Sequence, residues 1–249
     1  MRIAVWQAQG PDASAVRLAD AAARAAAAGA DVVVTPELFA TGYGRPFGPP
    51  DPELVGRWQE IATSCRIAVV ASEPHEGHIT AVVVRADGTL AGRYRKTHLW
   101  ADDERAAFSP GDGTPLIVEI GGLRCGVVIC YDVEFPEVVR GLALAGAQAL
   151  LVPTALDDAT VARVLVPARA MENRVAIAYA NHVGPGFCGA SVIAGPDGRE
   201  LARAGTDAEE LLVADVTAED LARARGLGDY LADRRPETYL PGRREVGER

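Results

Sequence analysis

The chain has 249 residues, a length that fits one large domain better than two small ones. Hydrophobic residues make up 49% and charged residues 24% of the chain, which is the composition of a globular protein and argues against a disordered one. The net charge is −9 and the lysines and arginines are scattered, so we expect neither a nucleic acid nor an anionic membrane as a partner. This charge favours a neutral or cationic substrate over a phosphorylated one.

The first ten residues, the apolar runs and the cysteines bear on where in the cell we expect the protein. The first ten residues lack the pattern of a signal peptide, and no run approaches the roughly 18 apolar residues that span a bilayer. The four cysteines, Cys65, Cys125, Cys130 and Cys188, are widely spaced and form no CxxC motif. We therefore expect reduced thiols, no structural metal and a cytoplasmic location.

Short apolar runs alternate with longer helical patterns along the chain. In its first half we expect strands at 2–7, 31–35, 67–72, 80–85 and 90–96, and helices at 14–28 and 52–65. In its second half we expect strands at 116–120, 123–129, 149–152, 176–181, 189–194, 200–203 and 211–215, and helices at 136–145, 161–172 and 218–225. Fully apolar strands need cover on both faces. The pattern predicts an α/β fold in which two mixed sheets stack, with helices outside each, as a single domain over residues 1–249.

Three of these strands end in residues that can carry chemistry. Glu37 follows a β-branched run, where partial desolvation would raise its pKa toward that of a general base near neutrality. Lys96 ends the second strand of a hairpin, where an ammonium group could stabilise an oxyanion. Taken singly, a solvated loop glutamate and a surface lysine are the commoner interpretations, and we give the neighbouring His98 no catalytic role.

The third strand end carries Cys130. An apolar strand, an abrupt turn and a helix begun by Pro136 have the layout of a nucleophile elbow, which would expose the sulfur at a sharp corner. We expect the dipole of the following helix to favour the thiolate there. Cys125, in the middle of the same strand, is expected to be buried and inert. A thiol, a carboxylate and an ammonium at three strand ends form a coherent set for acyl transfer.

The same three strand ends carry a family resemblance. The segments PELFATGY (36–43), YRKTHL (94–99) and CYDVEFPE (130–137) resemble, in order and separation, the three signature blocks of the nitrilase superfamily of carbon–nitrogen hydrolases. Further similar segments lie at 108–112, 152–155, 168–173 and 179–181. The resemblance covers nearly the whole chain, from Arg2 to about Tyr239.

This resemblance implies a Glu–Lys–Cys triad of Glu37, Lys96 and Cys130 in an αββα sandwich. It also implies that a second glutamate, Glu104, positions the substrate amide, although the acidic stretch around Glu104 could instead lie on the surface. Members of the family commonly dimerise, and the tail at 226–249 resembles the segment that reaches the partner subunit. We therefore expect a homodimer or a higher homo-oligomer.

Within the superfamily, the Cys-Tyr-Asp block resembles the amidase branch, in particular 5-aminopentanamidases and stereoselective amidases. The resemblance implies hydrolysis of a small amide through a cysteine thioester, with the backbone N–H of Tyr131 helping to bind the oxyanion and with no metal or organic cofactor. Glu134 would favour an amine-bearing substrate, or would pair with an arginine such as Arg169. By family position, three further residues would line the pocket: Tyr43, Thr154 and Ala155.

Two other activities, and a function without catalysis, stay open from the sequence. The same triad could hydrolyse an N-carbamoyl amino acid or amine, or, as a weaker option, a nitrile. A catalytically silent ligand-binding relative is disfavoured because all four candidate catalytic side chains are present.

Overall fold

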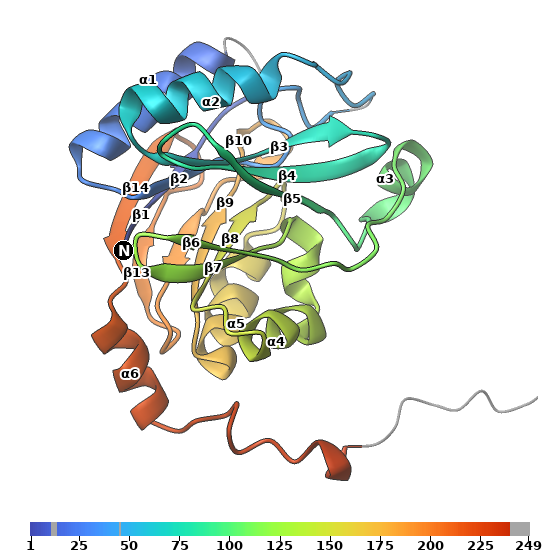
Figure 1. Ribbon diagram of the computed structural model, residues 1–249. Helices are drawn as coiled ribbons and strands as arrows, with labels where there is room; N and C mark the ends of the chain where they lie inside the picture. Colours follow the sequence, from blue (N-terminus) through green and yellow to red (C-terminus); the bar gives the residue numbers. More distant parts are fainter. Residues whose placement is uncertain (11–13, 45, 240–249) are drawn as a thin grey trace, which may run out of the picture.

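The computed structural model describes residues 1–10, 14–44 and 46–239. Two six-stranded mixed sheets lie face to face, and helices cover the outer face of each sheet (Figure 1). The layers therefore run helices, first sheet, second sheet, helices. This arrangement confirms the predicted α/β sandwich of two stacked mixed sheets.

The first sheet has the order β14-β1-β2-β3-β4-β5, in which β1, β2 and β3 are parallel neighbours. Its strands are β1 (Arg2–Gln7), β2 (Val32–Val34), β3 (Ala68–His75), β4 (His78–Val84), β5 (Leu90–Arg95) and β14 (Glu210–Asp215). Side chains alternate across each strand. Val33 packs outward against α1 (Ser14–Ala27) and α2 (Leu54–Cys65), whereas Val32 and Val34 pack inward between the sheets.

The second sheet has the order β13-β12-β9-β8-β7-β6, with β7, β8 and β9 parallel. Its strands are β6 (Leu116–Ile120), β7 (Leu123–Val127), β8 (Ala149–Pro153), β9 (Ala176–Ala180), β12 (Val192–Ala194) and β13 (Glu200–Arg203). The helices α4 (Pro136–Leu144) and α5 (Val166–Asn173) cover its outer face, and a π-helical segment, Val161–Leu165, leads into α5. The carboxyl ends of β2, β7 and β8 thus meet at one edge of the sandwich.

Three local features differ from the sequence-based expectation. A short helix, α3 (Ala101–Ala107), was not predicted, because only one of its seven side chains is buried and no apolar period marks it. A two-stranded hairpin, β10 (Val183–Gly184) with β11 (Phe187–Cys188), stands where a loop was expected. The expected strand at 189–194 is shortened to β12 (Val192–Ala194).

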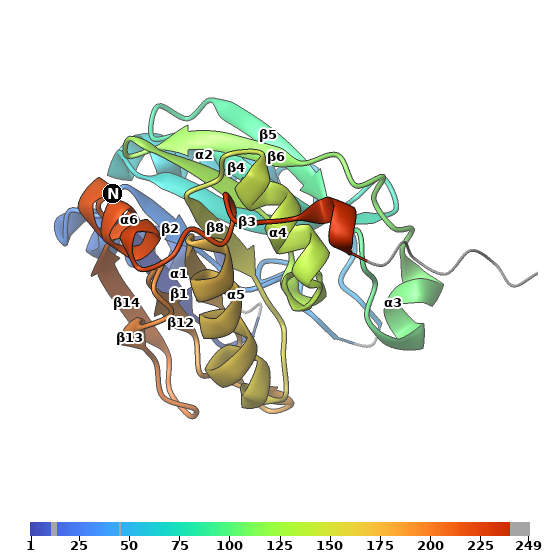
Figure 2. The same cartoon turned by 90° about the horizontal axis from the view of Figure 1, so that it is seen from below.

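The helix α6 (Ala218–Gly226) is followed by an extended segment that passes beneath α4 and α5 (Figure 2). Arg174 holds this segment: its Nε donates to the carbonyl of Gly228 over 2.9 Å, and its guanidinium lies 4.6 Å from the ring centroid of Tyr230. Contact of the tail with a partner subunit stays a prediction, and residues 240–249 lie outside the described residues. Within the described part of the chain, no helix is long and apolar enough to cross a membrane.

Candidate active site

Glu37 lies just beyond the end of β2, in a loop that is fixed between the two sheets. Its N–H donates to the carbonyl of Thr154 over 3.1 Å, and His182 Nε2 lies 2.6 Å from its carbonyl oxygen. The next residue, Leu38, has φ of +50° and donates its N–H to Ser72 Oγ over 2.7 Å. These contacts turn the Glu37 carboxyl inward, where it is fully buried.

Lys96 follows β5 and is also fully buried. Its N–H donates to the carbonyl of Ile79, and its own carbonyl accepts from Gly111, both over 2.8 Å. The side-chain Nζ donates to Glu37 Oε1 over 2.8 Å and to Glu104 Oε1 over 2.7 Å. An ammonium group has three N–H bonds, so two are used here and one is left.

Glu104 is the buried residue of α3 and is only 1% exposed, so the surface interpretation of this acidic stretch is wrong for Glu104. Its Oε1 also accepts from the hydroxyl of Tyr43 over 2.5 Å, and its Oε2 accepts from the N–H of Trp100 over 2.7 Å. Glu104 thus fixes the position of Lys96 from the side opposite Glu37.

Cys130 begins a turn of 3₁₀-helix, Cys130–Glu134, that joins the end of β7 to α4. Its φ is +46°, a left-handed conformation that is uncommon for a residue with a side chain. The layout of the predicted elbow is present: apolar strand, strained cysteine, then a helix with Pro136 in its first turn. The expected exposure of the sulfur is wrong, because Cys130 is only 4% exposed. The thiol lies 3.6 Å from the carbonyl oxygen of Ala155.

The expected thiolate at Cys130 is wrong as well. The helix whose dipole was expected to favour it, α4, begins only at Pro136, and burial raises the pKa of the thiol well above its usual range. The negative charge of Glu37 raises that pKa further, while Lys96 opposes the rise. The resting site therefore holds a neutral thiol that needs a base.

Glu37 has the properties of such a base. Burial, opposed by the charge of Lys96, raises the pKa of Glu37 to about 7. Its Oε2 is buried and receives no hydrogen bond from a nitrogen or oxygen donor of the described residues. The neighbouring Cys130 thiol also lowers the pKa of Glu37, although the hydrogen-bond contact of the thiol is with the carbonyl of Ala155. Burial acts to lower the pKa of Lys96, but the negative charges of Glu37 and Glu104 outweigh it and raise this pKa, so Lys96 is a cation.

The thiol faces a cavity of about 350 Å³. Of the residues expected at the site, Tyr43, Glu104, Cys130, Glu134 and Ala155 line this cavity. Thr154 does not: its side chain is fully buried and lies 3.4 Å from the carbonyl of Val152. The Tyr131 ring packs against Phe135, with centroids 4.9 Å apart, but the role expected of Tyr131 uses only its backbone.

The Glu134 carboxylate lies at the cavity wall. Arg169 pairs with Glu172 over 3.0 Å and donates to the backbone carbonyl of Glu134 over 2.8 Å. Among the residues the structure describes, no arginine or lysine lies within ion-pair distance of the Glu134 carboxylate. Partial burial raises the pKa of Glu134, and the charge of Arg169 opposes this rise. The other acidic residues at the cavity include Asp103 and Asp157.

Sequence reasoning missed two residues that support the site. His182 contacts the backbone of Glu37, and the buried Asp132 lies two residues beyond Cys130. The apolar run before His182 gave no hint of a contact with Glu37 across the sandwich. Asp132 stood in the signature block, but nothing in the sequence indicated what it contacts. Over the described ranges, no group of three or more His, Cys, Asp or Glu side chains is arranged to hold a metal ion.

Comparison with known proteins assigns this site to a class. The model of the carbon–nitrogen hydrolase family matches residues 2–226, so the chain belongs to that family. It is a hydrolase that acts on carbon–nitrogen bonds other than peptide bonds.

Individual relatives agree with this assignment. A glutamate-to-glutamine variant of an amidase from Nesterenkonia sp. AN1 superposes with a TM-score of 0.83 at 39% identity, over 95% of this chain and 97% of that one, and its structure shows the product of Michael addition of acrylamide to the active-site cysteine. A cysteine-to-alanine variant of the same amidase binds butyramide. An (R)-stereoselective amidase of Pseudomonas is 36% identical over 87% of this chain and 86% of its own. The N-carbamoylputrescine amidase of Solanum lycopersicum is 32% identical, over 85% and 83% of the two chains.

Proposed function

We propose that this protein is an amidase that hydrolyses a small carboxamide to a carboxylic acid and ammonia through a thioester of Cys130. The observation that carries the proposal is the convergence of three strand ends on one buried cluster. Lys96 bridges Glu37 and Glu104, and the thiol at the cavity interacts with both Glu37 and Lys96. The amidase from Nesterenkonia sp. AN1, whose cysteine-to-alanine variant binds butyramide, supports a substrate of this size.

The first half-reaction forms the thioester. Glu37 takes the Sγ proton of Cys130 as the sulfur attacks the carboxamide carbon. The third N–H of Lys96 and the backbone N–H of Tyr131 stabilise the tetrahedral oxyanion, each donor contributing about 3 kcal/mol. When the oxyanion collapses, the carbon–nitrogen bond breaks and Glu37 returns the proton to the departing ammonia.

The second half-reaction releases the acid. Water enters the place left by ammonia, and Glu37 removes a proton from it as the oxygen attacks the thioester carbon. The carbon–sulfur bond then breaks, and the proton returns to the Cys130 sulfur. Glu104 holds Lys96 in place in both half-reactions through its 2.7 Å contact and, by our proposal, positions the substrate amide.

An ammonia-release screen tests this proposal. We expect turnover among short aliphatic, amino-acid and ω-amino amides, and we expect Cys130→Ala to abolish it. Cys125→Ala, at the buried cysteine of the same strand, is the matched control and should retain full activity per folded molecule. Mass spectrometry of a rapidly quenched reaction should show the acyl group on Cys130. Undiminished turnover by Cys130→Ala would refute the mechanism.

We further propose that Glu134 selects an amine-bearing amide. Its carboxylate lies at the cavity wall and forms no ion pair with any residue that the structure describes, so a substrate ammonium would gain a charge-assisted hydrogen bond there. Such a bond contributes about 1.5–3 kcal/mol, which corresponds to roughly 10- to 150-fold in kcat/KM.

Paired substrates test this role of Glu134. We expect Glu134→Ala to lower kcat/KM for 5-aminopentanamide by that factor and to leave the value for the neutral hexanamide nearly unchanged. Asp157→Asn removes one negative charge from the exposed rim of the same cavity and serves as the control. Equal losses for both substrates would show that Glu134 has no role in specificity.

The alternative is hydrolysis of an N-carbamoyl amine by the same three side chains. It is favoured by the 32% identity to an N-carbamoylputrescine amidase. The product assay separates the two reactions, because attack on a ureido carbon releases CO₂ together with ammonia and an amine. Ammonia without CO₂ excludes the alternative.

A further inference from the structure

The carboxylate of Asp132 is fully buried and receives five hydrogen-bond contacts, although no arginine or lysine of the described residues pairs with it. Its Oδ1 accepts from Thr97 Oγ1 over 2.7 Å and from the N–H of His98 over 2.9 Å, and His98 Nδ1 lies 2.9 Å away. Its Oδ2 accepts from the hydroxyl of Tyr94 over 2.8 Å and from the N–H of Ile129 over 3.2 Å. Both oxygens thus accept from a backbone N–H.

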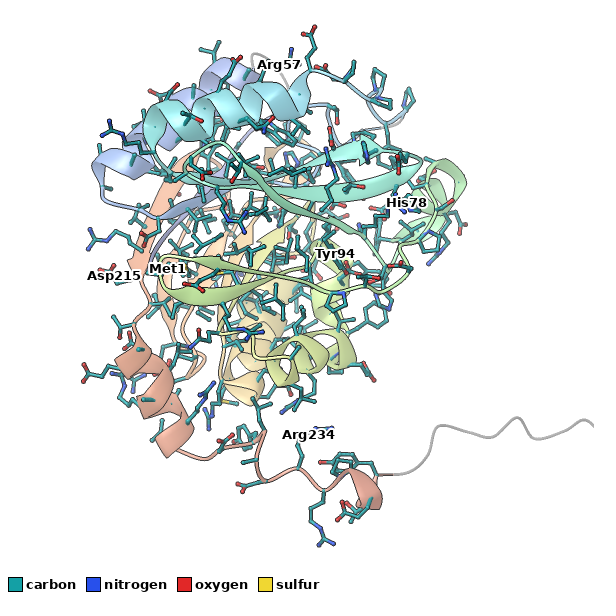
Figure 3. All side chains as sticks on the ribbon, viewed as in Figure 1. Met1, Arg57, His78, Tyr94, Asp215 and Arg234 are labelled. Atoms are coloured by element: carbon teal, nitrogen blue, oxygen red, sulfur yellow. The ribbon has the colours of Figure 1, made fainter. Side chains whose placement is uncertain are left out.

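These donors flank two residues of the active site. Tyr94 is the last buried residue of β5 and lies two positions before Lys96, which follows the strand; its side chain lies in the interior of the sandwich (Figure 3). Thr97 and His98 are the first two residues after Lys96. Ile129 directly precedes Cys130, so the one carboxylate joins the segment that carries the ammonium to the turn that carries the thiol.

The turn needs such a contact because Cys130 is strained. Its φ of +46° places the sulfur at the cavity, and a left-handed residue with a side chain persists only where its surroundings enforce it. The Asp132 side chain accepts from the N–H before Cys130, and the Asp132 N–H donates to the carbonyl of the same Ile129 over 3.0 Å. Together these two bonds close the turn around the cysteine.

We propose that Asp132 is a positioning residue that sets the Cys130 sulfur against Lys96. This inference rests on the proposed function of those two residues. It adds that Asp132 holds Lys96, which follows a strand of the first sheet, in place relative to Cys130, which follows a strand of the second sheet. Asp132 does not reach the cavity and takes no part in proton transfer. Its loss therefore lowers the rate of the chemical step and leaves substrate binding nearly unchanged.

The test is Asp132→Asn. The amide carries an NH₂ group in place of one carboxylate oxygen. This NH₂ group is a donor and would face the backbone N–H of either His98 or Ile129, so one of these two hydrogen bonds is lost. Because a displacement of about 1 Å can reduce a rate roughly 100-fold, we expect kcat to fall about 10- to 100-fold and KM to change less than threefold. The rate of Cys130 alkylation by iodoacetamide, measured without substrate, should fall as well.

The matched control is Asp220→Asn. Asp220 likewise accepts from a backbone N–H and a hydroxyl, both of Thr217, but it lies at the start of α6, away from the site. This variant should lower Tm without changing kcat per alkylatable Cys130. If Asp132→Asn behaves in the same way, Asp132 is purely structural and the inference is overturned.

Tyr94→Phe decides the question if Asp132→Asn does not fold. It removes one donor from Oδ2 and leaves the carboxylate in place, so we expect a fall in kcat of roughly threefold to tenfold at constant KM. An unchanged kcat would overturn the inference. The Cys130→Ala variant separates failure of this inference from failure of the proposed function. If Cys130→Ala is active, the proposed function is refuted. If Cys130→Ala is inactive and the Asp132 and Tyr94 variants are fully active, only the positioning role is refuted.

Discussion

The active site contains two clusters of buried carboxylates that are built in opposite ways. In the first, Glu37 and Glu104 share the single ammonium of Lys96, and one oxygen of Glu37 receives no hydrogen bond from a nitrogen or oxygen donor of the described residues. In the second, Asp132 accepts only from backbone, hydroxyl and imidazole groups, and both of its oxygens are satisfied.

The difference follows from what each cluster has to do. A group that must gain and lose a proton cannot be held by a full set of donors, because those donors would fix it as the anion. Glu37 is therefore under-satisfied and has its pKa raised to about 7. A group that only holds position gains from complete satisfaction, as at Asp132. The predictions below test this contrast, from the largest expected effect to the smallest.

Glu37→Gln should reduce kcat about 10²- to 10⁴-fold, because it removes the base while keeping the shape of the side chain. Steady-state ammonia release measures the loss. Glu73→Gln is the matched control: Glu73 is another buried glutamate, on β3, outside the cavity, and its replacement should leave kcat unchanged. Comparable losses in the two variants would contradict the special role of Glu37.

Lys96→Met should abolish turnover and also lower the free energy of unfolding by about 3–5 kcal/mol at pH 8, because it leaves two buried carboxylates without their cation. The folded-state pKa of Glu37 then rises further, so the folded state binds more protons than the unfolded state and stability recovers as the pH falls. Urea unfolding at pH 8 and pH 5 measures both values. An equal loss at the two pH values would contradict a cluster governed by charge.

The acid limb of the pH profile should report Glu37. Only the ionised carboxylate can accept the thiol proton, so kcat/KM should be constant above about pH 7 and fall tenfold per pH unit below it. The Asp132 cluster should add no second acid limb, because it takes no part in proton transfer. Activity that stays constant down to pH 5 would be incompatible with this assignment.

His182 should affect stability but not the position of the acid limb. Burial lowers its pKa from 6.5 to about 4, so between these values the unfolded state holds more protons and the fold loses up to about 3 kcal/mol as the pH falls. In His182→Gln this loss of the free energy of unfolding at low pH should be absent. The contribution of Glu37 to the pH dependence of stability is the same in both proteins and cancels in the comparison. Chemical unfolding at pH 7 and pH 4.5 compares them, and identical changes would contradict a buried neutral histidine.

Much of the fold could be predicted from residue patterns, because apolar periodicity reports directly which faces are buried. The run 31–35 was expected to be covered on both faces, and β2 is. The helix α3 escaped prediction because its sequence, ADDERAA, buries a single glutamate and has no apolar face. The same absence of signal made Glu104 ambiguous between the surface and the interior.

The sequence by itself determined the residue types at three strand ends and the strained turn at Cys130, because these depend on local order along the chain. Tertiary structure alone decided their environment: the shared ammonium, the neutral resting thiol, the place of Glu134 at the cavity wall and the burial of Thr154 away from that wall. Desolvation and hydrogen bonding depend on atoms brought from distant parts of the chain, here from two facing sheets. Asp132 shows this most clearly, since its position in the chain was evident and its five contacts were not.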